Sequence, residues 1–131
     1  MADAVTISRG DIVIVERLPD PLGGNPKDRR LIVIDITAGG LAILGVAIAG
    51  KSEDTPSNDS EVRLPTGRPY QPSRLGLVKP SVASCGWLAV VRVEDCQHVS
   101  GPIPENLRIA ITAKIQFLHQ HGLSTIVRND L

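Results

Sequence analysis

Three segments in the first half of the chain have the hydrophobic patterning of β-strands. They span residues 11–17 (DIVIVER), 30–36 (RLIVIDI) and 41–49 (LAILGVAIA), and each is rich in β-branched residues and bounded by turn formers. The first alternates apolar and polar positions, whereas the other two are apolar almost throughout. Two further strands are predicted at 75–81 (LGLVKPS) and 87–94 (WLAVVRVE). The pattern therefore predicts a mainly β protein with five or six antiparallel strands.

One helix is predicted, and it lies near the C-terminus. Pro104 and Glu105 suit its first turn, and Gly122 suits its end. Helical spacing places five apolar residues on one face: Leu107, Ala110, Ile111, Ile115 and Leu118. The predicted architecture is a small antiparallel barrel closed by this C-terminal helix.

Residues 45–52 (GVAIAGKS) match the phosphate-binding pattern G-x-x-x-x-G-K-[ST]. That pattern binds phosphate only where a strand leads into the glycines and a helix begins at the lysine. Residues 51–74 contain four prolines, which exclude a helix of any length, and the intervening VAIA favours extended backbone. We therefore interpret the match as the end of a strand and not as a nucleotide site.

Length and composition indicate a single domain over residues 1–131, with its core at about 9–120 and a C-terminal tail at 121–131. Apolar residues make up 42% of the chain but aromatic residues only 2%, so base stacking on several rings is nearly excluded. The chain has no basic and apolar leader, and its 15-residue uncharged run at 36–50 is shorter than a membrane span. We expect a cytoplasmic protein with no membrane contact.

Charge is balanced overall but unevenly spread. Fourteen basic and fourteen acidic residues give zero net charge, which removes any global attraction to nucleic acid. Residues 62–93 nevertheless contain five basic residues and no acid, and a second basic group, KDRR, occupies 27–30 at the end of a Pro- and Gly-rich loop. These segments fit either an ordinary solvated face or a groove for a phosphate backbone.

The histidines and cysteines give no convincing catalytic group. His119 and His121 lie near the C-terminus of the predicted helix, where a positively charged imidazolium complements the helix dipole, so we interpret them as capping residues. His98 is predicted to lie in a turn. Cys85 precedes an apolar strand and is expected to be a small core residue. With Cys96 it forms neither a metal-ligand pattern nor a disulfide framework, so we expect reduced thiols, no metal and no cofactor.

Five features occurring in order from about residue 9 to residue 119 resemble the PemK/MazF family of bacterial toxins. They are RGDIVIV at 9–15, RRLIVI at 29–34 after a Gly-rich loop, a buried third strand, GLVKPSVAS at 76–84 and the proline-led final helix. The resemblance implies an SH3-like, CcdB/MazF-like barrel that forms a homodimer and is neutralised by a cognate antitoxin peptide. It also implies an mRNA-interferase-like endoribonuclease that cleaves single-stranded RNA without a metal, by attack of a ribose 2′-OH on the adjacent phosphate.

The resemblance also implies roles for particular residues. Arg29 occupies the family's catalytic arginine position, and Arg30 replaces the proline that usually follows it, so a slip of one residue would exchange the two. Ser81 matches a polar position that lines the RNA groove. The residues expected to hold RNA are Lys27, Arg68, Lys79 and Ser81.

One expected group is missing. Relatives end the third strand with a threonine or serine beside the arginine, whereas the aligned positions here are Ile48, Ala49 and Gly50. Ser52 and Thr55, just beyond the strand, are the nearest candidates to replace that hydroxyl. Two hypotheses therefore stay open: an active endoribonuclease toxin, and a catalytically degenerate barrel that binds a peptide or nucleic acid.

Overall fold

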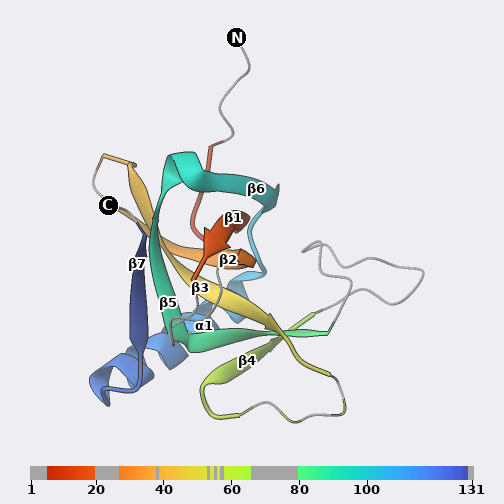
Figure 1. Ribbon diagram of the computed structural model, residues 1–131. Helices are drawn as coiled ribbons and strands as arrows, with labels where there is room; N and C mark the ends of the chain where they lie inside the picture. Colours follow the sequence, from red (N-terminus) through yellow and green to blue (C-terminus); the bar gives the residue numbers. More distant parts are fainter. Residues whose placement is uncertain are drawn as a thin grey trace, which may run out of the picture.

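A sheet of seven strands with one helix forms the protein (Figure 1). The computed structural model describes residues 6–19, 27–37, 39–52, 54, 56, 58–65 and 80–129. The strands are β1 (Ile12–Leu18), β2 (Lys27–Ile36), β3 (Ala42–Gly50), β4 (Glu61–Leu64), β5 (Ser81–Arg92), β6 (Cys96–Ser100) and β7 (Thr125–Asn129). A 3₁₀ turn, η1 (Val93–Asp95), precedes β6, and the helix is α1 (Glu105–Gln120).

The strands follow the order β4-β5-β3-β2-β1-β6, all antiparallel, and β7 adds to β5 in parallel. The outer edge of β5 is shared: β4 pairs with its first four residues, and β7 pairs with Trp87–Val91 (Figure 1). The prediction of a mainly β, antiparallel fold with a C-terminal helix is thus confirmed, with one parallel pair that it did not include. The end strands β4 and β6 do not pair with each other, so the described strands form an open sheet.

The sheet is buried on both faces, which explains why two of the predicted strands are apolar almost throughout. On one face, Ile12, Ile32 and Val46 pack with residues of α1. On the other face, Val15, Leu31 and other apolar residues form a second cluster. The helix contributes three buried residues to the first cluster, namely Ile111, Ile115 and Leu118. Leu107 is partly buried beside them as predicted, but Ala110 is exposed, so its predicted place on the buried face is wrong.

The helix ends as its sequence predicts. Gly122 has a φ of +68°, a conformation that glycine adopts without the Cβ clash. Its N–H donates to the carbonyl of His119 (3.1 Å), and the N–H of Leu123 donates to the carbonyl of Leu118 (2.8 Å). These two bonds form a Schellman motif, which satisfies carbonyls left open by the last turn and redirects the chain toward β7.

Strand β5 is interrupted by a three-residue bulge. Val46 of β3 pairs with Leu88, whereas the next residue, Ala47, pairs with Ser84, so residues 85–87 face no β3 partner. The N–H of Cys85 donates instead to the carbonyl of Ser60 (2.9 Å). Because the number of inserted residues is odd, the side chains after the bulge change faces relative to a regular strand.

The Arg9-Gly10-Asp11 motif has a structural role at the start of β1. Gly10 has a φ of +90°, and its N–H donates to the carbonyl of Val33 (2.7 Å). The buried Asp11 carboxylate accepts the N–H of Ser8 (2.9 Å) and lies 3.3 Å from Nε2 of His98. This motif therefore anchors the sheet. His98 lies in β6, so its predicted place in a turn is wrong.

Several predicted boundaries differ from the structure. The strand predicted at 87–94 is the second half of β5, which begins at Ser81, and residues 93–95 form η1. Residues 75–79 lie outside the described residues. Strands β4, β6 and β7 were not predicted, because they are four or five residues long and contain no fully apolar run.

Asp11→Ala is expected to lower the free energy of unfolding by about 1–3 kcal/mol, because it removes the buried carboxylate that accepts the Ser8 N–H. Asp35→Ala is the matched control. Asp35 forms an exposed ion pair with Arg9 (2.7 Å), so its loss should change stability little. Urea denaturation at pH 7 measures both, and equal losses in the two variants would contradict the structural role of Asp11.

Candidate functional site

Four cations gather where β1 and β2 approach their connecting loop: Arg17, Lys27, Arg29 and Arg30. Lys27 pairs with Leu18, Arg29 with Val15, and Arg30 with Ile14. Strand β2 begins three residues earlier than predicted, so Lys27 and Arg29 lie on the strand and not at the end of the loop. Alternation places these two side chains on one face of β2 and Arg30 on the other.

Arg29 is held by two contacts. Its Nε donates to the carbonyl of Leu18 (3.0 Å), and its guanidinium carbon lies 4.6 Å from the centre of the Trp87 ring. The side chain is half-buried, whereas Arg30 is exposed. The resemblance in sequence leaves the two arginines exchangeable. The structure distinguishes them. Arg29 is held on the face of the sheet that carries the second apolar cluster, whereas Arg30 is on the opposite face.

A bulge shapes the end of β1 beside Arg29. Between its pairs with Arg29 and Lys27, β1 contains one residue more than β2. Arg17, within this bulge, has a φ of +56°, which a non-glycine residue adopts at a cost of about 1 kcal/mol. Its N–H donates to Oδ1 of Asp28 (3.3 Å). The bulge thus changes the path of β1 just before Leu18, the residue whose carbonyl binds Arg29.

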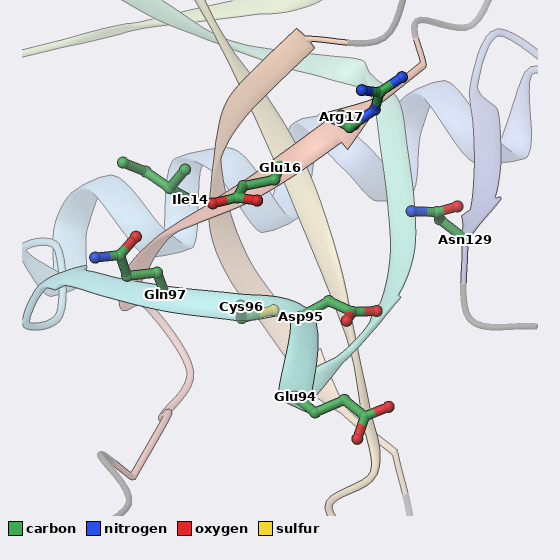
Figure 2. Close-up of a pocket in the computed structure, with 8 residues that line it drawn as sticks. All are labelled: Ile14, Glu16, Arg17, Glu94, Asp95, Cys96, Gln97 and Asn129. Atoms are coloured by element: carbon green, nitrogen blue, oxygen red, sulfur yellow. The ribbon is translucent and has the colours of Figure 1, made fainter.

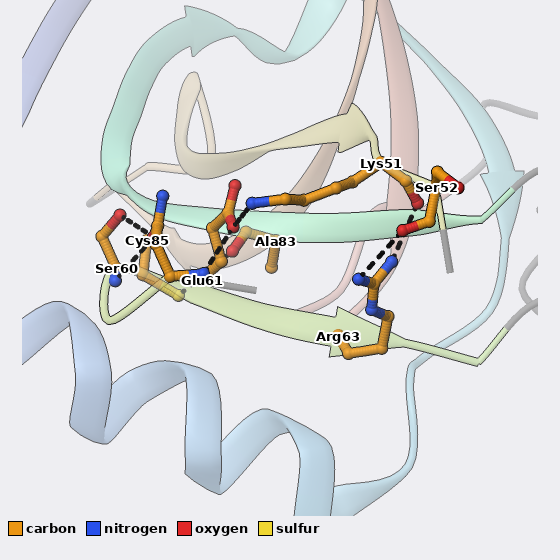
Figure 3. A network of polar contacts seen from close by, with 8 residues as sticks. Lys51, Ser52, Ser60, Glu61, Arg63, Ala83 and Cys85 are labelled. Carbon is orange, nitrogen blue, oxygen red and sulfur yellow. Dashed lines mark hydrogen bonds and ion pairs between the residues drawn. The ribbon is translucent and has the colours of Figure 1, made fainter. Parts of the chain in front are cut away.

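The segment after β3 is held by a polar network (Figure 3). Nζ of Lys51 lies 2.5 Å from Oε1 of Glu61, and both side chains are largely buried. Arg63 donates from its terminal nitrogens to the carbonyls of Lys51 (2.8 Å) and Ser52 (3.4 Å). The lysine of the G-x-x-x-x-G-K-S match is therefore the partner of a carboxylate. Because β3 continues to Gly50 and the described residues from 51 to 65 contain no helix, the interpretation as a strand end is confirmed.

Ser52 is exposed, and its hydroxyl accepts the N–H of Asp54 (3.3 Å) in a local turn. Arg29 contacts Leu18 and Trp87 instead. Within the residues that the structure describes, no hydrogen bond joins Ser52 to Arg29. Thr55 lies outside those residues, and the predicted catalytic role of Ser52 stays a prediction.

Of the four residues expected to hold RNA, two are placed by the structure. Lys27 is exposed at the start of β2. Ser81 is 6% exposed and begins β5, where it pairs with Gly50 on one side and Leu64 on the other. It therefore adjoins the end of β3. Arg68 and Lys79 lie outside the described residues.

The cysteines do not supply a nucleophile. Burial raises the pKa of Cys85 to about 11, and the nearby Lys114 lowers it only in part. Burial, with a further contribution from the Asp95 carboxylate, raises the pKa of Cys96 to about 11. Both thiols are therefore protonated at neutral pH. The prediction that Cys85 is a small core residue is confirmed, since it is fully buried.

A pocket of about 520 Å³ lies between β1, η1, β6 and the end of β7 (Figure 2). Three carboxylates line it, from Glu16, Glu94 and Asp95, together with Arg17 and four uncharged residues. This charge disfavours an RNA phosphate, so the pocket is not the expected place for an RNA backbone. Among the described residues, no three side chains of the metal-ligating types gather closely enough to hold an ion.

Trp87, which lies against Arg29, is not indicated as a site residue by the sequence, because the pattern of residues 87–94 shows only that it begins an apolar strand. No known family model matches the chain, and no curated protein is similar to it. The described part of the chain contains no helix with the length and apolar character needed to cross a membrane.

The ion pair in Figure 3 gives a pH-dependent prediction. Burial alone would raise the pKa of Glu61, but hydrogen bonds from Lys51 and from the N–H of Asn58 hold it below its ordinary value of 4.5. A lowered carboxyl pKa stabilises the fold above pH 4.5, and this stabilisation is lost as pH falls through the lowered pKa. Glu61→Gln should therefore cost about 1–2 kcal/mol at pH 7 and flatten the loss of stability below pH 4.5.

Urea unfolding at a series of pH values from neutral to acidic measures this effect. Glu94→Gln is the matched control, since the Glu94 carboxylate is exposed and lies 3.2 Å from Arg92. An unchanged pH profile in Glu61→Gln would contradict the role assigned to the Lys51 pair.

Proposed function

We propose that the chain is a PemK/MazF-like endoribonuclease, the toxin of a type II toxin–antitoxin pair, which cleaves single-stranded RNA without a metal. In this proposal the sheet belongs to an SH3-like barrel that forms a homodimer in the cytoplasm and is neutralised by an antitoxin peptide. The resemblance in sequence suggests the family. The structural observation that supports it is the fixed guanidinium of Arg29 among the cations at the start of β2.

The proposed reaction makes a specific demand on that arginine. When a ribose 2′-OH attacks the adjacent phosphate, negative charge grows on the non-bridging oxygens, and the products carry a 2′,3′-cyclic phosphate and a 5′-OH. A planar guanidinium donates two parallel hydrogen bonds to such oxygens. Nε of Arg29 donates to the Leu18 carbonyl, so the two terminal nitrogens are the ones that would donate hydrogen bonds to the phosphate oxygens.

The surrounding charge agrees with this role. Lys27 shares the Arg29 face of β2, so it is placed to contact a neighbouring phosphate along an extended strand of RNA. Local cations of this kind attract a phosphate backbone even where the net charge of the chain is zero. The carboxylate-lined pocket of Figure 2 would repel the same strand.

A second candidate function is favoured by the end of β3. Its last residues, Ala49 and Gly50, carry no hydroxyl, and the Ser52 hydroxyl is engaged by Asp54. Loss of one positioned donor typically lowers a rate by ~10²–10³. A barrel with Arg29 but without this second donor would bind single-stranded RNA or an antitoxin-like peptide without cleaving the RNA.

The two candidates are separated by incubation with mixed-sequence single-stranded RNA in excess EDTA and without nucleotide. Arg29→Ala is expected to reduce cleavage by ~10²–10³ relative to the unmodified protein. Arg30→Ala is the matched control, because it removes the same charge from the other face of β2, and it should stay within about threefold. Mass spectrometry of the products should show the cyclic phosphate.

Equal losses in the two variants would contradict the assignment of Arg29 and indicate a purely electrostatic contribution. Intact RNA at high protein excess, with binding detected by fluorescence anisotropy, would favour the binding module. Circular dichroism of each variant shows whether the fold is retained.

A further inference from the structure

Trp87 lies against the arginine on which the proposed function depends. Its ring centre is 4.6 Å from the guanidinium carbon of Arg29, within the range of a cation–π contact. The ring packs against the second apolar cluster, on the face of the sheet that carries Arg29. It is the chain's only tryptophan.

The β5 bulge is what brings the ring to this face. Ala83 and Cys85, before and within the bulge, belong to the cluster beneath α1, and so does Leu88 after it. Trp87 and Ala89 belong to the opposite cluster. In a regular strand Cys85 and Trp87 would share a face, so the bulge is what directs Trp87 toward Arg29.

The indole nitrogen indicates that the ring is not placed by its own hydrogen bonding. Nε1 of Trp87 is buried and has no acceptor within the described part of the structure. Most buried N–H groups are paired, and an unpaired one is costly. Besides its packing against the second apolar cluster, the ring makes a contact between its face and the guanidinium of Arg29.

We propose that Trp87 is a positioning residue for Arg29. The ring face and the Leu18 carbonyl restrict the guanidinium of Arg29 from two directions. The Arg29 side chain is therefore already in one rotamer when its terminal nitrogens bind an RNA phosphate. This inference rests on the proposed function and adds to it a residue that does not itself contact the reacting atoms. An aromatic ring at residue 87 is required, whereas its N–H is not.

Two substitutions separate the ring from the N–H. Trp87→Phe keeps an aromatic face and removes the N–H, and Trp87→Leu removes the aromatic face. Phe117→Leu is the matched control, since Phe117 is an aromatic residue on α1, 53% exposed. The readouts are kcat and KM for single-stranded RNA in EDTA, with the thermal unfolding midpoint of each variant.

Trp87→Leu should lower kcat by ~10-fold with KM within about threefold, because binding charges remain while Arg29 is less well oriented. Trp87→Phe should restore kcat to within about threefold of the unmodified protein. Phe117→Leu should leave both constants unchanged. Trp87→Leu with normal kcat, or Trp87→Phe as slow as Trp87→Leu, would overturn the inference.

The single tryptophan provides an independent readout in the unmodified protein. Titration with 2′-O-methyl RNA, which lacks the attacking hydroxyl, should change the Trp87 emission, because a phosphate bound at Arg29 alters the charge over the ring. Cleavage of RNA together with an unresponsive Trp87 emission would overturn the inference and leave the proposed function standing.

The same analogue covers the case of binding without cleavage. Anisotropy of labelled 2′-O-methyl RNA should then show an affinity about threefold weaker in Trp87→Leu and unchanged in Trp87→Phe. Equal affinities in all variants would overturn the inference alone. An unmodified protein that neither cuts RNA nor binds the analogue would overturn the proposed function and the inference together.

Discussion

The fold depends on the way β5 divides its pairing. Along one edge it pairs with β3, and along the other it pairs first with β4 and then with β7. The division falls at the bulge of residues 85–87, where a Cβ on Gly86 would lie only 3.1 Å from the carbonyl of Leu123. That close approach favours a glycine, because a Cβ there would require the backbone carbonyl of Leu123 to move by a few tenths of an ångström. The end of α1, the start of β7 and the bend of β5 are therefore packed as one unit, and Trp87 takes its direction from that unit.

The same bulge links the hydrophobic core to the chemistry. Burial on both faces makes the sheet rigid, so a side chain near the end of one of its inner strands has a fixed position. Arg29 is such a side chain. Leu31, two residues further along β2, is fully buried, and Val15, which pairs with Arg29, belongs to the same apolar cluster as Leu31. Rigid support of this kind suits recognition of a phosphate, since the entropy of ordering the guanidinium is lost on folding and not again on binding. In the proposed function, placement of this one arginine therefore matters more than the net charge of the molecule.

The sequence pattern predicted the strands whose residues are buried on both faces of the sheet. It did not predict the short strands that form only by pairing with a neighbouring strand. The apolar runs of β2 and β3 can be recognised in the sequence because both faces of these strands are covered. The end of α1 can be recognised because its Schellman motif uses Gly122. Strands β4, β6 and β7 carry polar residues at half or more of their positions and become strands through pairing with β5 or β1. The site was predicted only in part. Arg29 followed from the resemblance, but its contact with Trp87 depends on a change of strand face, which no local pattern encodes.

An arginine fixed in this way serves binding and catalysis equally, so the difference between the two candidate functions lies in proton transfer. Attack by a 2′-OH needs an acceptor within hydrogen-bonding reach of that hydroxyl. Both cysteines are protonated at neutral pH, the Asp11 carboxylate is buried beside His98, and Glu61 is occupied by Lys51. Ser52 is the described hydroxyl nearest in sequence to the end of β3, and it accepts a bond from Asp54. Breaking that single 3.3 Å bond in an exposed turn is cheap compared with ordering a new segment, so the Ser52 hydroxyl is available to donate a hydrogen bond to a phosphate oxygen of bound RNA. A neutral hydroxyl is too weak a base to take the 2′-OH proton, so the acceptor that separates a nuclease from a binding surface must be another group.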